Sequence, residues 1–369
     1  MVRTVKNAAA VAGLAVALTL ACSETSAPSS ASFPRETGQV PPGPAAAPTL
    51  TLQESGTTQR LQAVSPVSSQ VVWASGLGGT YALTTDGGEH WQAGVVPGAE
   101  QLQFRDVEGV SADIAYLLSA GTGRESRIYK TIDGGKHWKL QIQNEIPTAF
   151  FDCFDFWTPF RGIAFSDAVA GRFPVLRTIN SRTWIDVGRK LPQAQPGEAG
   201  FAASGTCIAT LGDRQAWIAT GGAAKARILA TTDGGESWNA YETPIVQGTP
   251  ASGGFSVAFR DPDHGILVGG DLESEAPPTN NVALSQDGGK SWTLASPTPF
   301  PGAAFGVAYV PGAGSQTVVA TGPGGTAWSS DEGGTWQALA GITTYWAVAF
   351  AGNDGWLVGT EGKILKLSF

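Results

Sequence analysis

The chain of 369 residues is poor in the side chains that carry most enzyme chemistry. It has three His, three Cys and one Met, and only 15% of its residues are Asp, Glu, Lys or Arg. The His and Cys residues have no metal-ligand spacing, and neither a nucleophile elbow nor a Ser, His and Asp order is present. The formal net charge is −8, and an acidic chain without a basic run is a poor candidate for nucleic-acid binding. We therefore predict no metal, no cofactor and no nucleic-acid partner.

The amino-terminal apolar run is too short to span a membrane. Arg3 and Lys6 precede the run from Ala8 to Ala21, which has the length of a signal-peptide core. It ends in LTLAC, which resembles a bacterial lipobox with Cys22 as the lipidated residue. We expect residues 1–21 to be a lipoprotein signal peptide. The mature chain, with a net charge of about −10, would be exported and lipid-anchored to the cell envelope, on the periplasmic or outer-membrane side. An ordinary cleaved signal with a chance Cys22 is the alternative.

The rest of the chain divides into a tether and one large domain. Residues 22–48 are rich in Pro, Ser and Ala and cannot bury a core, so we expect a disordered tether. Residues 49–369 hold most of the 49 Gly residues of the chain, which fit an all-β domain with many tight turns.

One motif recurs through this domain. Five copies read TTDGGEHW, TIDGGKHW, TTDGGESW, SQDGGKSW and SSDEGGTW, and a shorter copy reads TINSRTW. Their Asp or Asn stands at positions 86, 133, 180, 233, 287 and 331, so neighbouring copies are 44 to 54 residues apart. A period of this length, with short apolar runs between the copies, is typical of a β-propeller.

Each copy is interpreted as a hairpin corner. The Asp side chain accepts backbone N–H bonds, the Gly pair supplies unusual backbone angles, and the Trp covers the gap between blades. A carboxylate pair for hydrolysis must flank one sugar, and corners on separate blades cannot do so. We interpret the following residues as structural: Asp86, Trp91, Asp133, Trp138, Trp184, Asp233, Trp238, Asp287, Trp292, Asp331 and Trp336.

The apolar runs predict a single seven-bladed β-propeller of four-stranded antiparallel blades. The last unit starts at Trp346 and has three strands, so Thr49 to Gln53 can supply the fourth by pairing with Lys363 to Leu367. Six or eight blades are the alternatives. The first strand of blade four is expected over Gly200 to Thr210, and blade three, which lacks the Asp and the Gly pair, is expected to have a looser corner.

Two cysteines lie on the predicted innermost strands of blades three and four. Cys153 and Cys207 are therefore candidates for a disulfide in an exported protein, since adjacent inner strands can bring them within reach. Two buried free thiols are the alternative.

Blades three to five carry the most polar inner strands and the longest connections. We predict a binding site on one face of these blades, because ligands of such rings dock on loops carried by a rigid scaffold. The alternative is that the Arg and acidic residues neutralise each other around the channel. The candidate residues are Asp152, Asp155, Arg161, Arg172, Glu198, Ser204, Arg227, Arg260 and Asp271.

Two resemblances follow from these motifs. The repeated motif resembles the Asp box of BNR-repeat propellers, with His90 and His137 where Ser or Thr is usual. Residues 151–172, 197–207 and 255–271 resemble bacterial relatives of the photosystem II stability/assembly factor family. That resemblance implies a seven-bladed propeller that binds a protein during assembly, partly through an Arg patch, to which Arg161, Arg172, Arg227 and Arg260 would correspond as a group.

Three functions are compatible with these sequence features. The favoured one is a monomeric, non-enzymatic envelope lipoprotein that binds a protein partner, such as a membrane protein, and touches the membrane only through its lipid. A glycan-binding or sialidase-like glycosidase is the second, with Trp157, Trp346 and Trp356 as stacking faces if exposed. The Arg-Ile-Pro strand of sialidases is missing. An oxidoreductase-like protein is the third, and no cofactor site supports it.

Overall fold

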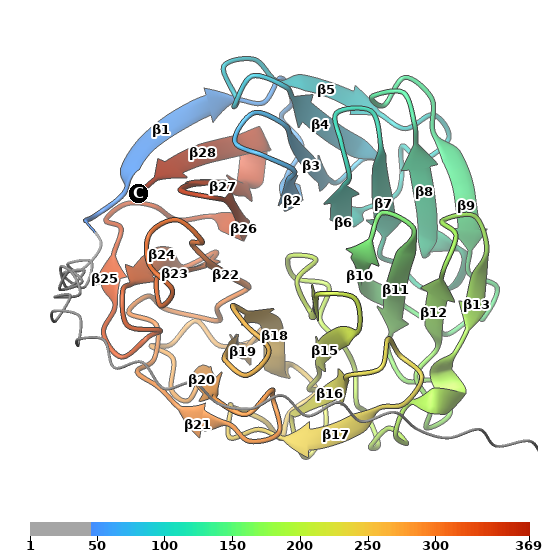
Figure 1. Cartoon of the computed structure of the whole chain (residues 1–369), viewed down its shortest axis with the longest axis vertical. Coiled ribbons are helices and arrows are strands. Elements are labelled where there is room, and N and C mark those ends of the chain that lie inside the picture. The colour runs from blue at the N-terminus through green and yellow to red at the C-terminus, as the bar shows by residue number, and fades with distance from the viewer. Residues whose placement is uncertain (1–45) are drawn as a thin grey trace, which may run out of the picture. The chain divides into compact units, whose positions relative to one another are not determined.

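Residues 46–369 form a ring of seven four-stranded sheets around a central axis (Figure 1). The structure is a computed structural model and describes these residues; the expected signal peptide, Cys22 and nearly all of the expected tether lie outside them. Neighbouring strands in every sheet are antiparallel, so the predicted seven-bladed propeller is confirmed. Within residues 46–369, no helix has the length and apolar character of a membrane span.

Each blade runs from an innermost strand at the axis to an outermost strand at the rim. The strands of blades 1 to 4 are β2 (Leu61–Pro66), β3 (Val72–Gly76), β4 (Thr80–Thr84) and β5 (Gln92–Val95); β6 (Phe104–Gly109), β7 (Ala115–Ser119), β8 (Arg127–Thr131) and β9 (Lys139–Gln143); β10 (Phe151–Thr158), β11 (Arg161–Ser166), β12 (Val175–Thr178) and β13 (Trp184–Asp186); and β14 (Ile208–Leu211), β15 (Gln215–Ala219), β16 (Arg227–Thr231) and β17 (Asn239–Glu242).

Blades 5 to 7 follow the same order. Their strands are β18 (Ser252–Phe259), β19 (Gly265–Asp271), β20 (Val282–Ser285) and β21 (Thr293–Leu294); β22 (Gly306–Tyr309), β23 (Val318–Gly322), β24 (Gly325–Ser329) and β25 (Gln337–Ala338); and β26 (Tyr345–Ala351), β27 (Asp354–Gly359), β28 (Lys363–Ser368) and β1 (Thr49–Glu54). Three 3₁₀ turns complete the described chain: η1 (Gly123–Glu125), η2 (Gly188–Lys190) and η3 (Thr360–Gly362).

The middle strands of the blades are buried on both faces. In β3, β7, β23 and β24 every residue is buried, as expected where one blade packs on the next and both faces of a sheet are covered. Trp73, Trp217, Trp328 and Trp356 are the largest fully buried side chains and fill the space between blades. Burial of this apolar surface is the main force that holds the ring together.

The ring is closed by the amino-terminal strand, as the sequence predicts. β1 pairs with β28 from Thr49 opposite Ser368 to Glu54 opposite Lys363. Gln53 adds side-chain bonds across this seam. Its Oε1 accepts from the indole N–H groups of Trp91 (3.0 Å) and Trp356 (3.2 Å), and its Nε2 donates to the Gly87 carbonyl (3.0 Å). One side chain therefore ties the closing strand to blades 1 and 7.

Replacing Gln53 with Ala is expected to lower the free energy of unfolding by about 2–5 kcal/mol, because it leaves two buried indole N–H groups unpaired. Urea unfolding measures the loss. Thr51→Ala, on an exposed position of the same strand, is the control and is expected to change stability by less than about 0.5 kcal/mol. Equal effects of the two substitutions would show that the seam depends on backbone pairing alone.

The repeated motifs form the turns between the third and fourth strands, which we call the repeat turns. In blade 1 the Thr84 hydroxyl donates to Asp86 (2.8 Å) and accepts the Gly88 N–H (2.9 Å), while Asp86 accepts the His90 N–H (2.9 Å). His90 Nδ1 lies 2.8 Å from the other oxygen of Asp86, where Ser237 and Ser291 place hydroxyls in blades 4 and 5.

The repeat turn of blade 3 is weaker, as expected from its sequence. The bond from Thr178 to Asn180 is 3.5 Å long, against 2.6 to 3.0 Å for the corresponding bonds of the other five turns. The Trp residues of these turns differ more than the motif suggests. Trp91, Trp292 and Trp336 donate their indole N–H groups, whereas those of Trp138, Trp184 and Trp238 are buried without a partner in residues 46–369.

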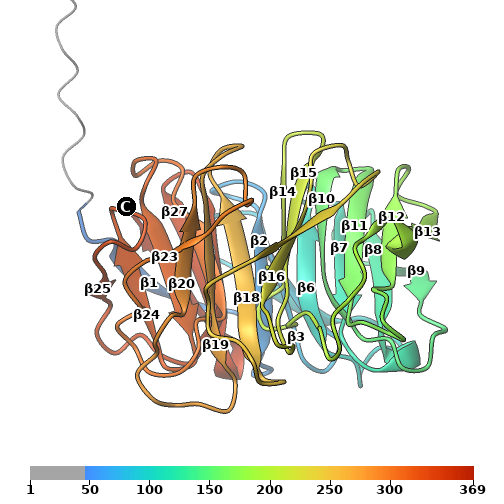
Figure 2. The ribbon, with the colours of Figure 1, turned by 90° about the horizontal axis from the view of Figure 1, so that it is seen from below.

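The two ends of the ring carry different sets of turns. Because strands alternate in direction, the repeat turns lie at the same end as the turns between first and second strands; we call this the repeat-turn end. The connections between blades and between second and third strands lie at the other, long-loop end. Figure 2 shows the ring from the side, with the start of β1 and the carboxy-terminus at one edge, which is the repeat-turn end.

Candidate functional site

A loop of blade 4 fills the mouth of the central channel at the long-loop end. The sequence predicted a strand over Gly200 to Thr210, but β14 begins at Ile208. Residues 200–206, which we call the plug, instead cross the axis. Ser204 donates to the Phe305 carbonyl of blade 6 (2.7 Å), and Gln62 of blade 1 donates to the Ala202 carbonyl (3.1 Å). The prediction of a strand is wrong for residues 200–207, because the plug bonds to distant blades instead of pairing with the neighbouring strand of its own sheet.

A glycine allows the plug to approach the inner wall closely. Gly205 has a φ of +78°, and a Cβ at this position would lie 2.5 Å from Asp106 Oδ1. Any other residue would be strained in its backbone and would collide with β6.

β-bulges on the inner strands direct side chains toward the plug. The pairing of the first two strands shifts by one residue in blades 1, 2, 3, 5 and 7. A bulge inserts one residue and re-aims its side chain. The inserted residues are Gln62, Arg105, Asp152, Phe255 and Trp346. Each contacts the plug or lines the cavity above it.

The cavity above the plug has a volume of 150 Å³, and we call it the central pocket. Phe201, Ala202 and Ala203 of the plug form its floor. Its walls come from five other blades: Arg60, Gln62, Arg105, Leu272, Phe305 and Trp346. Leu272 is 51% exposed at the rim, so an apolar side chain faces solvent beside the opening.

Two arginines in the central pocket have no carboxylate partner. Arg60 lies over the Trp346 ring, 4.8 Å from its centre, and its Nε is buried without a partner in residues 46–369. Arg105 donates to Gln103 Oε1 (2.6 Å) and to the Ala202 carbonyl (3.4 Å). No ion pair in this part of the chain involves either one.

The two charges are held at an electrostatic cost. Burial lowers the pKa of Arg60, and burial together with the nearby Arg60 charge lowers the pKa of Arg105. A guanidinium nevertheless stays protonated in proteins. A like-charged pair in an aromatic setting is destabilising unless an anion joins it, and such local conflicts mark functional sites. The arrangement can therefore bind a carboxylate with charge-assisted hydrogen bonds.

A groove continues from the central pocket between blades 5 and 6. It has a volume of 440 Å³ and shares Leu272 and Phe305 with the pocket. Pro301, Ala303 and Pro323 give it an apolar wall. Asp271 and Glu275 lie at its margin, so acidic groups line the groove and basic groups line the pocket.

Several predicted site residues neutralise each other near this face. Glu198 is 1% exposed and accepts two bonds from Arg227, at 2.9 and 2.5 Å. Arg172 is exposed and lies 3.9 Å from Asp186. Asp271 accepts from the Thr249 hydroxyl (3.1 Å). Arg227 is therefore committed to a buried ion pair and has little capacity for a ligand.

The two predicted Asp residues on β10 lie behind the plug and below it. Burial, and then the neighbouring Asp167, raises the pKa of Asp152 well above its usual range. A Cβ on Gly200 would lie 2.8 Å from the Asp152 carboxyl carbon, so the plug covers this side chain. Asp155 accepts the Thr210 N–H (2.7 Å) on the neighbouring inner strand, and burial raises its pKa to about 6.

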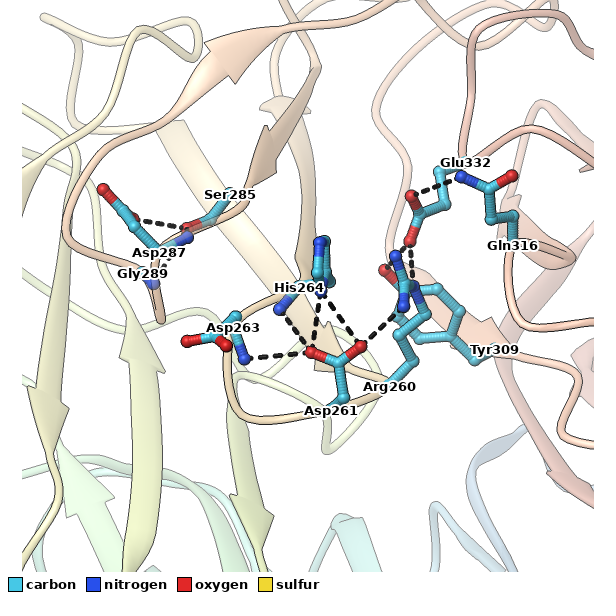
Figure 3. A network of polar contacts seen from close by, with 10 residues as sticks. All are labelled: Arg260, Asp261, Asp263, His264, Ser285, Asp287, Gly289, Tyr309, Gln316 and Glu332. Atoms are coloured by element: carbon cyan, nitrogen blue, oxygen red, sulfur yellow. Dashed lines mark hydrogen bonds and ion pairs between the residues drawn. The ribbon is translucent and has the colours of Figure 1, made fainter.

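The structure places Arg161 and Arg260 at the repeat-turn end, so the nine candidates do not share one face. Arg161 begins β11 and lies over Trp157. Arg260 follows β18 and joins blade 5 to blade 6 by pairing with Asp261 (2.5 Å) and Glu332 (2.6 Å), as Figure 3 shows. Both residues stand in turns between first and second strands. The sequence interpretation grouped them with Arg172 by blade and did not distinguish the two ends.

Glu332 holds this second network together. It stands where other repeat turns have their first glycine and keeps a φ of +53°. Its carboxylate accepts from Arg260, Tyr309 (2.9 Å) and Gln316 (3.4 Å), and these bonds offset the backbone strain (Figure 3). Because every charge in the network is paired, we interpret it as an interblade tie.

The structure joins Cys153 and Cys207 by a disulfide, with their Cα atoms 6.0 Å apart. Cys153 lies beside the bulged Asp152, and Cys207 directly follows the plug. The bond therefore fixes the base of the plug to blade 3.

Sequence reasoning missed Arg60, Gln62, Arg105 and the plug. Arg60 and Arg105 stand at the start of inner strands in different blades, 45 positions apart, next to Leu61 and Phe104, and nothing local distinguishes them. A signal did exist: a polar residue follows the first apolar position of the inner strand in three blades, as Gln62, Arg105 and Asp152. This pattern indicates a site only when the bulge, which turns these side chains toward the plug, is known.

Buried acids predict an unusual dependence of stability on pH. Burial raises the pKa values of Asp155 and Asp167 to about 6, above the unfolded value of about 3.9. The folded state then binds more protons than the unfolded state, so stability is expected to fall as pH rises from about 4 to about 6. Asp133 acts oppositely: bonds from His137 lower its pKa to about 2, and its contribution is gained from about pH 2 to 4.

We therefore expect maximal stability near pH 4–5, measured by urea unfolding at intervals from pH 3 to 8. Asp155→Asn is expected to flatten part of the decline above pH 4. Stability that rises steadily from pH 4 to 7 would contradict the assignment.

The fold defines the chain as a seven-bladed β-propeller with a plugged channel, and several solved structures are similar to it in fold. A YCF48 structure described as bound to D1 peptide has a TM-score of 0.61, 14% identity, and coverage of 91% of this chain and 100% of that chain. YCF48 from Cyanidioschyzon merolae has a TM-score of 0.56, 15% identity, and coverage of 88% and 99%. The WD40 propeller domain of Doa1 has a TM-score of 0.54, 14% identity, and coverage of 88% and 97%. No family model and no curated protein matches the sequence.

Proposed function

We propose that this chain is a non-enzymatic, protein-binding propeller of the cell envelope, comparable in role to an assembly factor. In this proposal a partner protein presents an extended segment that lies in the groove and places a carboxylate in the central pocket. The single observation that carries it is the pair of Arg60 and Arg105, which lie half-buried in one aromatic pocket and form no ion pair with an acid within residues 46–369, although the Asp152 carboxyl lies near enough to act on Arg105.

The shape of the site supports a peptide as the ligand. The central pocket is large enough for one carboxyl-bearing side chain or chain end, and the adjoining groove of 440 Å³ has room for further residues. An aromatic and proline-rich wall suits the apolar side chains of an extended segment. One of the similar propellers, YCF48, is described with a bound D1 peptide, and we propose the same class of ligand here.

The proposal includes features outside the site. We propose that the repeat turns are Asp boxes of the BNR type, that Cys22 carries lipid after cleavage of residues 1–21, and that the ring is monomeric. The glycan alternative has little support, because Trp157 is 8% and Trp356 0% exposed, and Trp346 is covered by Arg60.

A displayed random-peptide library tests the proposal directly. The wild-type protein is expected to select peptides with an Asp, a Glu or a free carboxy-terminus beside apolar residues. The selected peptides are then measured by fluorescence anisotropy against wild type and against Arg60→Gln with Arg105→Gln. Selection of no acidic peptide, or equal affinity of the variant, would refute a carboxylate site.

A further inference from the structure

Three exposed apolar side chains project from turns at the repeat-turn end of blades 2 and 3. Ile132 is 70% exposed, Phe160 60% and Ile179 65%. Their turns adjoin one another: the Ser181 N–H donates to the Phe160 carbonyl (3.1 Å), and Lys130 of blade 2 donates to the Ser181 hydroxyl (2.9 Å). Large apolar residues gathered at the tips of neighbouring turns mark a surface that contacts something other than water.

The turns that carry these tips, and the strands beside them, also hold basic residues. Lys136, Arg161 and Arg182 stand in the same turns, and within residues 46–369 none of them forms an ion pair. Lys130 lies just behind them. The acidic residues at this end of blades 2 and 3 are Asp113, between β6 and β7, and Asp133. This sector therefore holds four basic residues and two acidic ones.

The remaining repeat-turn end has the opposite charge. In blades 4 to 7 and blade 1 there are four basic residues, Arg214, Arg260, Lys290 and Lys366, against eleven acidic ones: Asp86, Glu89, Asp213, Asp233, Glu236, Asp261, Asp263, Asp287, Asp331, Glu332 and Asp354. The apolar tips therefore coincide with the basic sector of an otherwise acidic end, and of a chain whose net charge is −8.

The amino-terminal part of the chain joins the ring at this same end. β1 starts at Thr49, opposite Ser368 of β28, and its direction places residue 46 at the repeat-turn end (Figure 2). The central pocket opens at the other end. A surface that contacts the repeat-turn end therefore leaves the pocket free.

We propose that Ile132, Phe160 and Ile179, with Lys136, Arg161 and Arg182 around them, form a docking surface for an anionic lipid bilayer. Apolar tips can enter the headgroup region while flanking basic residues pair with anionic lipids. Each basic residue near such a surface strengthens association about fivefold, an effect that salt screens. The ring would then rest on the membrane by this sector and present the central pocket to the aqueous side.

Site-specific fluorescence tests this orientation. A single Cys replaces Ile132, Phe160 or Ile179 in the full chain carrying Cys22→Ser, and each is labelled with an environment-sensitive dye. Cys153 and Cys207 are bonded and buried and do not react. The vesicles contain either phosphatidylglycerol with phosphatidylcholine or phosphatidylcholine alone, with or without doxyl-labelled acyl chains. The dye reports contact of the tip itself, whatever residues 1–45 do.

With anionic vesicles we expect a blue shift and doxyl quenching at all three tips. Labels at Val95 and Leu294, which are 48% and 39% exposed, serve as matched controls and are expected to show neither. Lys136→Ala with Arg182→Ala is expected to raise the lipid concentration that gives half of the maximal emission change about 25-fold. Equal signals at tips and controls would overturn the proposal. If the blue shift appears without lipid and grows with protein concentration, the surface binds a second copy of the chain and not a bilayer.

Discussion

Replacing Arg60 and Arg105 together with Gln is expected to abolish peptide binding without weakening the fold. Each guanidinium can donate charge-assisted bonds worth about 1.5–3 kcal/mol, so loss of both lowers affinity by at least about a hundredfold. The folded protein also loses two half-buried like charges. We therefore expect the free energy of unfolding to stay level or to rise by up to about 2 kcal/mol.

Anisotropy with a selected acidic peptide and urea unfolding on the same samples provide the two readouts. Arg189→Gln with Arg214→Gln is the matched control, because both residues are exposed and the change in net charge is equal. The control is expected to alter affinity only through long-range electrostatics, by an amount that disappears in high salt. A double variant that is strongly destabilised would instead identify the two arginines as structural.

Removal of the buried disulfide through Cys153→Ala with Cys207→Ala is expected to lower the free energy of unfolding by about 4 kcal/mol. The bond joins positions 54 residues apart. A closed loop of that length reduces the entropy of the unfolded chain by the equivalent of about 4 kcal/mol. That is a large part of the 5–15 kcal/mol that ordinarily holds a domain folded.

The same variant is expected to loosen the plug, because Cys207 fixes its base to blade 3. Amide hydrogen exchange of residues 200–206 is expected to become faster than that of β3 or β23, and peptide affinity to fall as the pocket floor becomes mobile. Thr51→Ala, at an exposed position of β1, is the control for the effect of substitution itself. A double variant whose unfolding free energy lies within about 1 kcal/mol of wild type would show that the loop is already restricted in the unfolded chain.

The sequence by itself determined the architecture of this protein. The repeat turns recur every 44 to 54 residues, and each is a local structure, made by a hydroxyl, a carboxylate and two glycines within eight residues. Local bonds can be read from local sequence, so the blade repeat and the weaker turn of blade 3 were predictable. Closure by Thr49 to Gln53 joins the two ends of the chain, and it was predicted because the last unit has three strands and lacks a fourth.

Only the tertiary structure decided the site. Arg60, Arg105 and Trp346 come from three blades, and residues 200–206 depart from strand structure because their partners lie on blades 1, 2 and 6. The separation of Arg161 and Arg260 from Arg172 likewise depends on which end of a strand each occupies. Interactions between residues far apart in sequence leave no local pattern, so the pocket and its two arginines emerge only when the ring closes.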